Sequence, residues 1–185
     1  MPRRHRLPAL LLLAMVAGCA APQGAGGPTT AAELQEFGVP EQSTLRTGNH
    51  SGPTPTTIPG ARRVTTAEVV AMLRAGPPPP VLIDVATGGG HPTIPGATWL
   101  PRGGLGTGFE DEVQRGLVAT AERLAGGDRG RAIVTFCPNQ NCWLSYNAAL
   151  RLVRAGFTNV HWYRGGYQAW AAAGQPTMPS SVTGW

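Results

Sequence analysis

Short apolar runs alternate with amphipathic stretches through the middle and the end of the chain. The runs at 81–85, 132–136 and 160–163 are almost continuously apolar and are bounded by glycine, proline or polar residues, which is typical of strands buried on both faces of a sheet. Around them, apolar residues recur at helical spacing and predict helices at 66–75, 110–125, 145–155 and 167–173. Strands that alternate with helices predict a single α/β domain, a parallel sheet with helices on both faces.

The start of the chain has the three-part pattern of a secretory signal. Basic residues at 3–6 precede an apolar run at 7–17, and glycine and cysteine follow. The run is shorter than the ~20 apolar residues of a spanning helix, so we expect a cleaved signal peptide at 1–18. Val16-Ala17-Gly18-Cys19 resembles the bacterial lipobox, which implies lipidation of Cys19 and a periplasmic, lipid-anchored protein. Ala20 in place of Asp implies sorting to the outer membrane, and ordinary cleavage with an incidental Cys19 is the alternative.

The segments between the signal and the first predicted helix, and after the last one, are rich in glycine and proline or short. The chain holds 26 glycines and 18 prolines among 185 residues, and many of them fall in a segment that we predict to be a tether and an extended arm at 19–61. Residues 177–185 are expected to form a C-terminal tail. The formal charge is +5, but three of the arginines lie in the signal segment and no basic face follows. We therefore expect no nucleic-acid partner.

Cys137 directly follows the predicted strand at 132–136 and precedes a polar loop and the helix at 145–155. In parallel sheets, reactive groups gather beyond the carboxyl ends of the strands. A loop that closes at a helix N-terminus directs backbone N–H groups and the positive end of the helix dipole at one place. Such surroundings lower a thiol pKa below the free value of roughly 8.5. We therefore expect Cys137 to be a reactive thiol, and a buried structural thiol is the alternative.

Cys142 is the other thiol once Cys19 is assigned to lipid. A loop of this length can bring two Cα atoms within the ~4.4–6.8 Å that a disulfide requires. Cys142 can therefore form a disulfide with Cys137, resolve a persulfide on Cys137, or be an ordinary loop residue. Two thiols lack the further ligands of a tetrahedral metal centre, so we expect no metal, and no cofactor is implied.

Several motifs, in one order along 62–176, resemble those of the rhodanese family. They are Leu82-Ile83-Asp84-Val85, Ile94-Pro95-Gly96-Ala97, Phe136-Cys137, Ser145-x-x-Ala148-Ala149 and Gly165-Gly166-Tyr167-x-x-Trp170. The resemblance implies a rhodanese-like domain in which Cys137 carries a persulfide, as in a sulfurtransferase, and in which Asp84 orients the active loop. The residues expected to bind the sulfur substrate through this loop are Asn139, Gln140, Asn141, Trp143 and Ser145.

A narrower resemblance rests on segments 53–61, 99–101, 126–128 and 142–149. They are similar to an exported rhodanese-like family that is named for a CXXCW motif and associated with PQQ-dependent catabolism. This resemblance implies partners among PQQ-dependent alcohol dehydrogenases and c-type cytochromes. The spacing in this chain is Cys-x4-Cys-Trp, at Cys137, Cys142 and Trp143.

Two cationic positions of a usual sulfurtransferase are missing, because the loop at 138–144 holds no Arg or Lys and Ala86 follows Asp84-Val85. Thiosulfate would have to rely on backbone amides alone. Three functions therefore stay open: a persulfide carrier, a non-catalytic accessory protein of a PQQ-dependent system, and a thiol-redox protein that uses both cysteines. The sulfur donor and acceptor are not indicated. We expect Trp143, His91 and His161 to have structural roles or, for the histidines, to be exposed.

Overall fold

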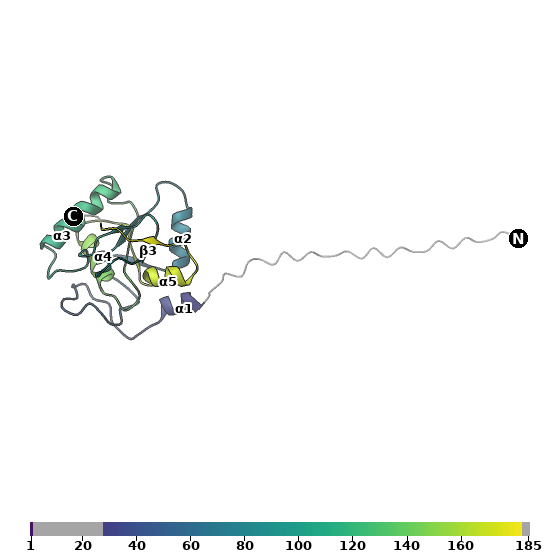
Figure 1. Ribbon diagram of the computed structural model, residues 1–185, viewed down its shortest axis with the longest axis horizontal. Helices are drawn as coiled ribbons and strands as arrows, with labels where there is room; N and C mark the ends of the chain where they lie inside the picture. Colours follow the sequence, from purple (N-terminus) through teal and green to yellow (C-terminus); the bar gives the residue numbers. More distant parts are fainter. Residues whose placement is uncertain (2–27, 183–185) are drawn as a thin grey trace.

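The computed structural model describes residue 1 and residues 28–182 of the chain (Figure 1). Residues 2–27 and 183–185 lie outside the described part. The first of these ranges includes Cys19 and almost all of the expected signal segment. Within the described part, no helix is both long enough and apolar enough to cross a membrane. The cleavage and lipidation at Cys19 therefore stay predictions.

Five parallel strands form the central sheet, in the order β1-β6-β5-β2-β4. Every residue of β2, β5 and β6 is buried, which confirms that the apolar runs form central strands. The register sets Asp84 beside Phe136 and Phe136 beside Tyr163, so three carboxyl ends meet at one edge. The strands are β1 (Arg62–Val64), β2 (Val81–Asp84), β4 (Thr98–Trp99), β5 (Ile133–Phe136) and β6 (Val160–Tyr163).

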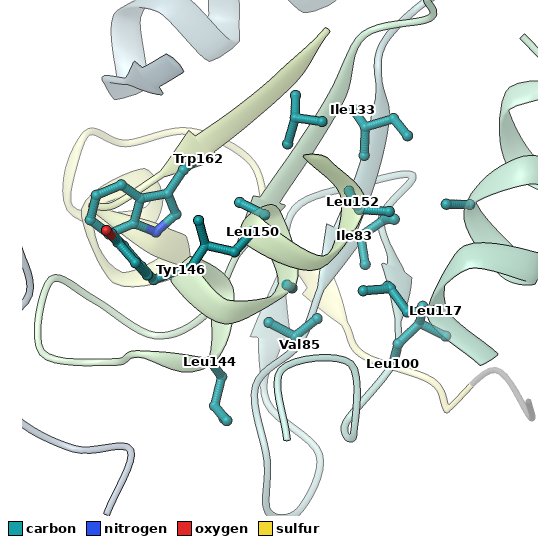
Figure 2. Close-up of a cluster of buried hydrophobic side chains, with 14 of the residues drawn as sticks. Ile83, Val85, Leu100, Leu117, Ile133, Leu144, Tyr146, Leu150, Leu152 and Trp162 are labelled. Atoms are coloured by element: carbon teal, nitrogen blue, oxygen red, sulfur yellow. The ribbon is translucent and has the colours of Figure 1, made fainter. Parts of the chain in front are cut away.

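Helices cover both faces of this sheet, as the alternating pattern predicts. Alternate strand residues point to opposite sides. Ile83 and Trp162 pack in one core with α3 (Glu112–Ala125) and α4 (Leu144–Arg154), which Figure 2 shows. Leu82 and Tyr163 pack in a second core with α2 (Thr66–Arg74) and α5 (Gly166–Ala172). The chain thus has the expected α/β architecture.

Side-chain caps set where two helices begin. Thr65 and Glu68 form a reciprocal capping box at the start of α2. Asp111 accepts from the amide of Gln114 at 2.8 Å, so α3 begins at Glu112 and not at residue 110. Gly126 ends α3 in the left-handed conformation, with φ of 67°.

A buried ion pair ties α4 to the loop before α3. Arg151, whose side chain is fully buried, donates to both carboxylate oxygens of Asp111 at 3.0 Å. It also donates to the carbonyls of Leu105 and Gly108, at 2.6 and 2.8 Å. Burial acts to raise the pKa of Asp111, but the guanidinium and several amides outweigh it and hold this pKa well below its ordinary value.

The segment before β1 packs against the domain over much of its length. It begins with α1 (Pro28–Leu34), which contacts α5. The carboxylate of Glu33 is buried and accepts from the backbone amide and the hydroxyl of Thr66. Arg164 is 1% exposed and donates to the carbonyls of Glu33 and Gln35 and to both oxygens of Thr54, at 2.8–3.0 Å. The described part of the expected tether and arm is therefore docked.

Two short strands form a second, small sheet outside the central one. β3 (Pro92–Thr93) and β7 (Met178–Pro179) are antiparallel, with Thr93 opposite Met178. The first residues of the expected C-terminal tail thus return to the loop that follows β2. This pairing places Ser180 beside His91, whose backbone carbonyl accepts from the Ser180 amide at 2.8 Å.

Candidate functional site

Cys137 lies immediately after β5, at the edge where the carboxyl ends of β2, β5 and β6 meet. Its side chain is 1% exposed. The structure joins it to Cys142 in a disulfide, with the Cα atoms 6.3 Å apart. Of the roles left open for Cys142, the disulfide is the one that this structure contains.

A serine hydroxyl faces the sulfur of Cys137. The Oγ atom of Ser145 lies 3.1 Å from Cys137 Sγ and accepts from the indole Nε1–H of Trp162 at 3.0 Å. Because the indole can only donate, the hydrogen of Ser145 is free to point at the sulfur. A hydroxyl in this position stabilises a thiolate on Cys137 when the disulfide is reduced.

The first turn of α4 adds positive potential at the same place. Trp143 is the N-cap residue and forms no side-chain cap, and the amides of Leu144, Ser145 and Tyr146 donate to no acceptor among the described residues. These amides form the positive end of the helix dipole. The amides of the preceding residues 141–143 already donate within the protein. The backbone amides that are available to bind an anion therefore lie at the start of the helix and not along the whole loop.

The Gly165–Gly166 turn supports the loop from the side of α5. Gly166 has φ of +63°, and a Cβ there would collide with the carbonyl oxygen of Cys137. The amide of Tyr167 donates to that same oxygen at 3.2 Å. Glycine at 166 is thus required by both the backbone conformation and the close approach.

The docked arm covers the cysteine loop along an extended edge. Ser51 forms an antiparallel bridge with Cys142, and the amide of Trp143 donates to the carbonyl of His50 at 2.9 Å. The indole N–H of Trp143 donates to the carbonyl of Pro53 at 3.1 Å, and Arg46 lies over the indole at 4.7 Å from the ring centroid. Trp143 is buried by these contacts and does not line the cavity beside Cys142, so the structure gives it a packing role and not the substrate-binding role that was also expected.

A cavity of about 310 Å³ opens beside Cys142, whereas Cys137 is buried and does not line it. Desolvation is the main cause that lowers the pKa of His50, which therefore lines this cavity as a neutral imidazole. Its Nε2 atom is buried and has no hydrogen-bond partner among the described residues. The lining residues include no Arg or Lys; they are His50, Ser51, Thr87, Pro138, Asn139, Asn141, Cys142 and Leu144.

The expected binding residues divide into two groups. Asn139 and Asn141 line the cavity, and Ser145 contacts the sulfur of Cys137. Gln140 does not line it; its carbonyl accepts from the amide and the hydroxyl of Thr54, at 3.2 and 2.6 Å. Nothing in the hydrophobic pattern pointed to His50, because the arm docks through backbone groups that leave no periodic signal.

Asp84 holds a neighbouring loop and does not contact the cysteine loop directly. Its carboxylate is buried and accepts from the amide of Ala86 at 2.9 Å, from Thr93 Oγ1 at 2.6 Å and from His91 Nε2 at 2.8 Å. These bonds fix the loop at 86–93. Thr87 of this loop lines the cavity beside Cys142, so Asp84 orients one wall of the site.

The fold and the cysteine loop define an α/β domain with a reducible cysteine pair at a strand end. The family described as "Rhodanese-like domain" matches residues 57–173, and the chain belongs to this family. No curated protein matches the sequence.

Solved structures of similar fold come from several bacteria. A thiosulfate sulfurtransferase from Pseudomonas aeruginosa is 22% identical over 66% of this chain and 21% of its own, with a TM-score of 0.46. This chain thus spans about a fifth of that protein. A polysulfide-sulfur transferase homodimer from Wolinella succinogenes is 22% identical over 64% and 79%, with a TM-score of 0.46. The rhodanese-like domain of an Anabaena protein is 23% identical over 66% and 88%, with a TM-score of 0.45.

Proposed function

We propose that this protein is a sulfur carrier in which Cys137, once reduced, holds a persulfide. The observation that carries the proposal is the Ser145 hydroxyl, 3.1 Å from Cys137 Sγ at the uncapped start of α4. Both features favour negative charge on sulfur, whether on a thiolate or on the terminal sulfur of a persulfide. Reaction with a hydropersulfide forms a new S–S bond at Cys137, breaks the S–S bond of the donor and releases the donor thiolate.

The donor class follows from the charge of the cavity. The lining residues offer amide groups and the neutral imidazole of His50 but no Arg or Lys. A doubly charged anion such as thiosulfate is therefore poorly compensated, since charge-assisted hydrogen bonds are the strong ones for such groups. An organic hydropersulfide brings less charge into the cavity. We expect it to be the better donor.

Cys142 has a defined part in this chemistry. Its thiolate attacks the inner sulfur of the Cys137 persulfide, forms the Cys137–Cys142 disulfide and releases hydrosulfide. The same disulfide also supports a second candidate function, a dithiol redox protein. Because Cys142 lines the cavity while Cys137 is buried and does not line it, an incoming thiolate meets Cys142 first and displaces Cys137 as the leaving group.

Intact-mass measurement separates these functions. The reduced protein is treated with an alkyl hydropersulfide or with thiosulfate, and an added 32 Da is expected with the first donor. Cys142→Ser should retain the adduct for longer, because resolution is blocked, and Cys137→Ser should lose it. Failure of every donor to add sulfur to Cys142→Ser would reject the carrier. Reduction and reoxidation of the disulfide without sulfur uptake would leave the redox function.

We further propose that the protein is anchored by lipid on Cys19 in the periplasm, at the outer membrane. The support is the lipobox-like Val16-Ala17-Gly18-Cys19. Radiolabelled palmitate should be incorporated by the parent chain, and Cys19→Ala should remove the label and leave the protein in the soluble periplasmic fraction. Palmitate on Cys19→Ala would contradict this assignment.

The partner that we propose is a PQQ-dependent alcohol dehydrogenase or a c-type cytochrome that serves it. The support is the similarity of segments 53–61 and 142–149 to the CXXCW-motif family. A purely accessory role, without sulfur chemistry, is favoured by the missing loop cations. Growth on alcohols whose oxidation requires PQQ should slow after deletion of the gene, and expression of the parent chain should restore it. Return with Cys137→Ser would identify the accessory role, and normal growth after deletion would reject the partnership.

A further inference from the structure

A second group of reactive side chains lies at the end of the small β3–β7 sheet. Ser180 follows β7 and pairs with His91, which precedes β3. The amide of Ser180 donates to the His91 carbonyl at 2.8 Å, and the amide of His91 donates to Ser180 Oγ at 2.9 Å. The oxygen of Ser180 is thus held by a backbone amide. Its hydrogen is left for another acceptor.

The imidazole of His91 lies between this serine and a buried carboxylate. Its Nε2 atom is 2.8 Å from Asp84 Oδ2, and its Nδ1 atom is 3.4 Å from Ser180 Oγ. Acceptors face both nitrogens, since the Gly89 carbonyl lies 3.3 Å from Nδ1. The contact of Nε2 with the carboxylate is much the shorter, so we assign the hydrogen of the neutral ring to Nε2, which leaves the lone pair of Nδ1 on the side of Ser180. Serine, histidine and aspartate are the three groups that activate a serine nucleophile on several unrelated folds. In this chain the two ring nitrogens are exchanged relative to the usual triad, because Nδ1 faces the serine and Nε2 faces the carboxylate.

The surroundings hold the imidazole in this orientation. Its ring stacks on Tyr167 with centroids 4.8 Å apart and meets the ring of Trp99 nearly at right angles, at 4.9 Å. If Nδ1 takes the proton of Ser180, the Gly89 carbonyl can accept a hydrogen bond from Nδ1–H, while Asp84 still accepts the hydrogen bond from Nε2–H. The charged form of His91 therefore has an acceptor on both nitrogens.

A cavity of about 360 Å³ opens over Ser180 and His91, within the range of small-ligand sites. It shares no lining residue with the cavity beside Cys142. The amide of Gly90, which lines it, donates to no acceptor among the described residues. The walls around His91 and Ser180 carry no charged side chain; they are Gly90, Pro92, Thr177, Met178 and Pro179.

We propose that Ser180 is an activated nucleophile, with His91 as its general base, in a second site that reacts with small uncharged esters. Asp84 is a positioning residue for His91. The Oγ atom of Ser180 bonds to the acyl carbon while its proton passes to His91 Nδ1. The ester C–O bond then breaks, and the leaving alcohol takes this proton. Water hydrolyses the acyl-serine, so the cycle needs no oxidant, and neither cysteine takes part in it.

The test uses a fluorophosphonate, which reacts with activated serines by forming a P–O bond and losing fluoride. Peptide mapping of the labelled chain should place one adduct on Ser180. Ser181→Ala is the matched control, because Ser181 is the exposed neighbour, and it should be labelled like the parent. Ser180→Ala should lose the adduct. His91→Gln keeps a side chain that can donate to Asp84 but removes the base, so labelling should slow at least ~100-fold.

A second comparison does not depend on how well a variant folds. The parent chain unfolded in urea should lose the Ser180 adduct, because the base and the nucleophile then separate. Thermal unfolding checks that His91→Gln is folded at the labelling temperature. Absence of an adduct on Ser180 in the folded parent would overturn the proposal. So would equal labelling rates for the folded parent and the urea-unfolded chain, or for the parent and a folded His91→Gln.

Discussion

Removal of the Ser145 hydroxyl tests how the protein stabilises negative charge on Cys137. Ser145→Ala deletes the group 3.1 Å from Cys137 Sγ and also removes the acceptor of the Trp162 indole. A hydrogen bond to a charged group contributes about 1.5–3 kcal/mol. Since ~1.4 kcal/mol corresponds to a factor of ten, the thiolate fraction of Cys137 should fall about 10- to 100-fold where the thiol form predominates.

The assay is alkylation by iodoacetamide under reducing conditions, with Cys142→Ser present so that one thiol of the loop reacts. On the acidic limb of the pH profile, the rate is proportional to the thiolate fraction. The indole left without an acceptor should lower the free energy of unfolding by about 1–3 kcal/mol as well. Both effects are read on the same protein.

Thr135→Val is the matched control. The Thr135 hydroxyl donates to the backbone carbonyl of Ser145 at 3.0 Å and is fully buried, and no hydrogen bond joins it to the cysteine sulfur in the structure. Its loss should destabilise the domain to a similar extent without slowing alkylation. A rate for Ser145→Ala within twofold of the parent would refute the reasoning. An equal fall in Thr135→Val would show that the effect comes from loosened packing.

Three further predictions concern the buried charges. Arg151→Met leaves the partly buried Asp111 carboxylate without its partner and should lower the free energy of unfolding by about 3 kcal/mol, measured by urea denaturation; a loss below about 1 kcal/mol would contradict this. The pKa of Asp111 is lowered in the folded chain, so its stabilisation is present above the unfolded pKa of ~3.9 and is lost as the pH falls toward the folded value. The urea concentration at the unfolding midpoint should therefore fall when the pH is lowered below about 4. Asp111→Asn should flatten this pH dependence. Arg164→Met removes the donors that hold Thr54, so proteolysis within the arm should rise at least ~10-fold while the sheet stays protected, and unchanged cleavage would show that the arm is held elsewhere.

The sequence predicted the central sheet because its strands are buried on both faces and read as unbroken apolar runs. The same pattern placed Cys137 at a strand end before a helix, where the structure has it. It missed the docking of the arm, since His50 and Pro53 bind the loop through backbone carbonyls that any residue could supply. Buried groups such as Glu33 gave no signal either, because charged residues in a Gly- and Pro-rich segment are usually solvated.

Ser180 illustrates another limit. A serine in a terminal segment has no distinguishing pattern, and its neighbour His91 was expected to be structural or exposed. The contact between them depends on the pairing of two-residue strands far apart in the chain. Such short pairings have too few side chains to show a period of two. The relation between Ser180 and His91 therefore becomes visible only in three dimensions.

The docked arm changes where this domain begins as a unit of folding. The family match starts at residue 57, yet Tyr146 of α4 exchanges hydrogen bonds with Gln42, and Asn147 does so with Arg46. A chain shortened to residue 57 would expose the indole of Trp143 and leave these polar groups to water. We therefore expect that a fragment made to fold on its own needs this arm, and that the sequence shared by the family is only part of what stabilises the domain.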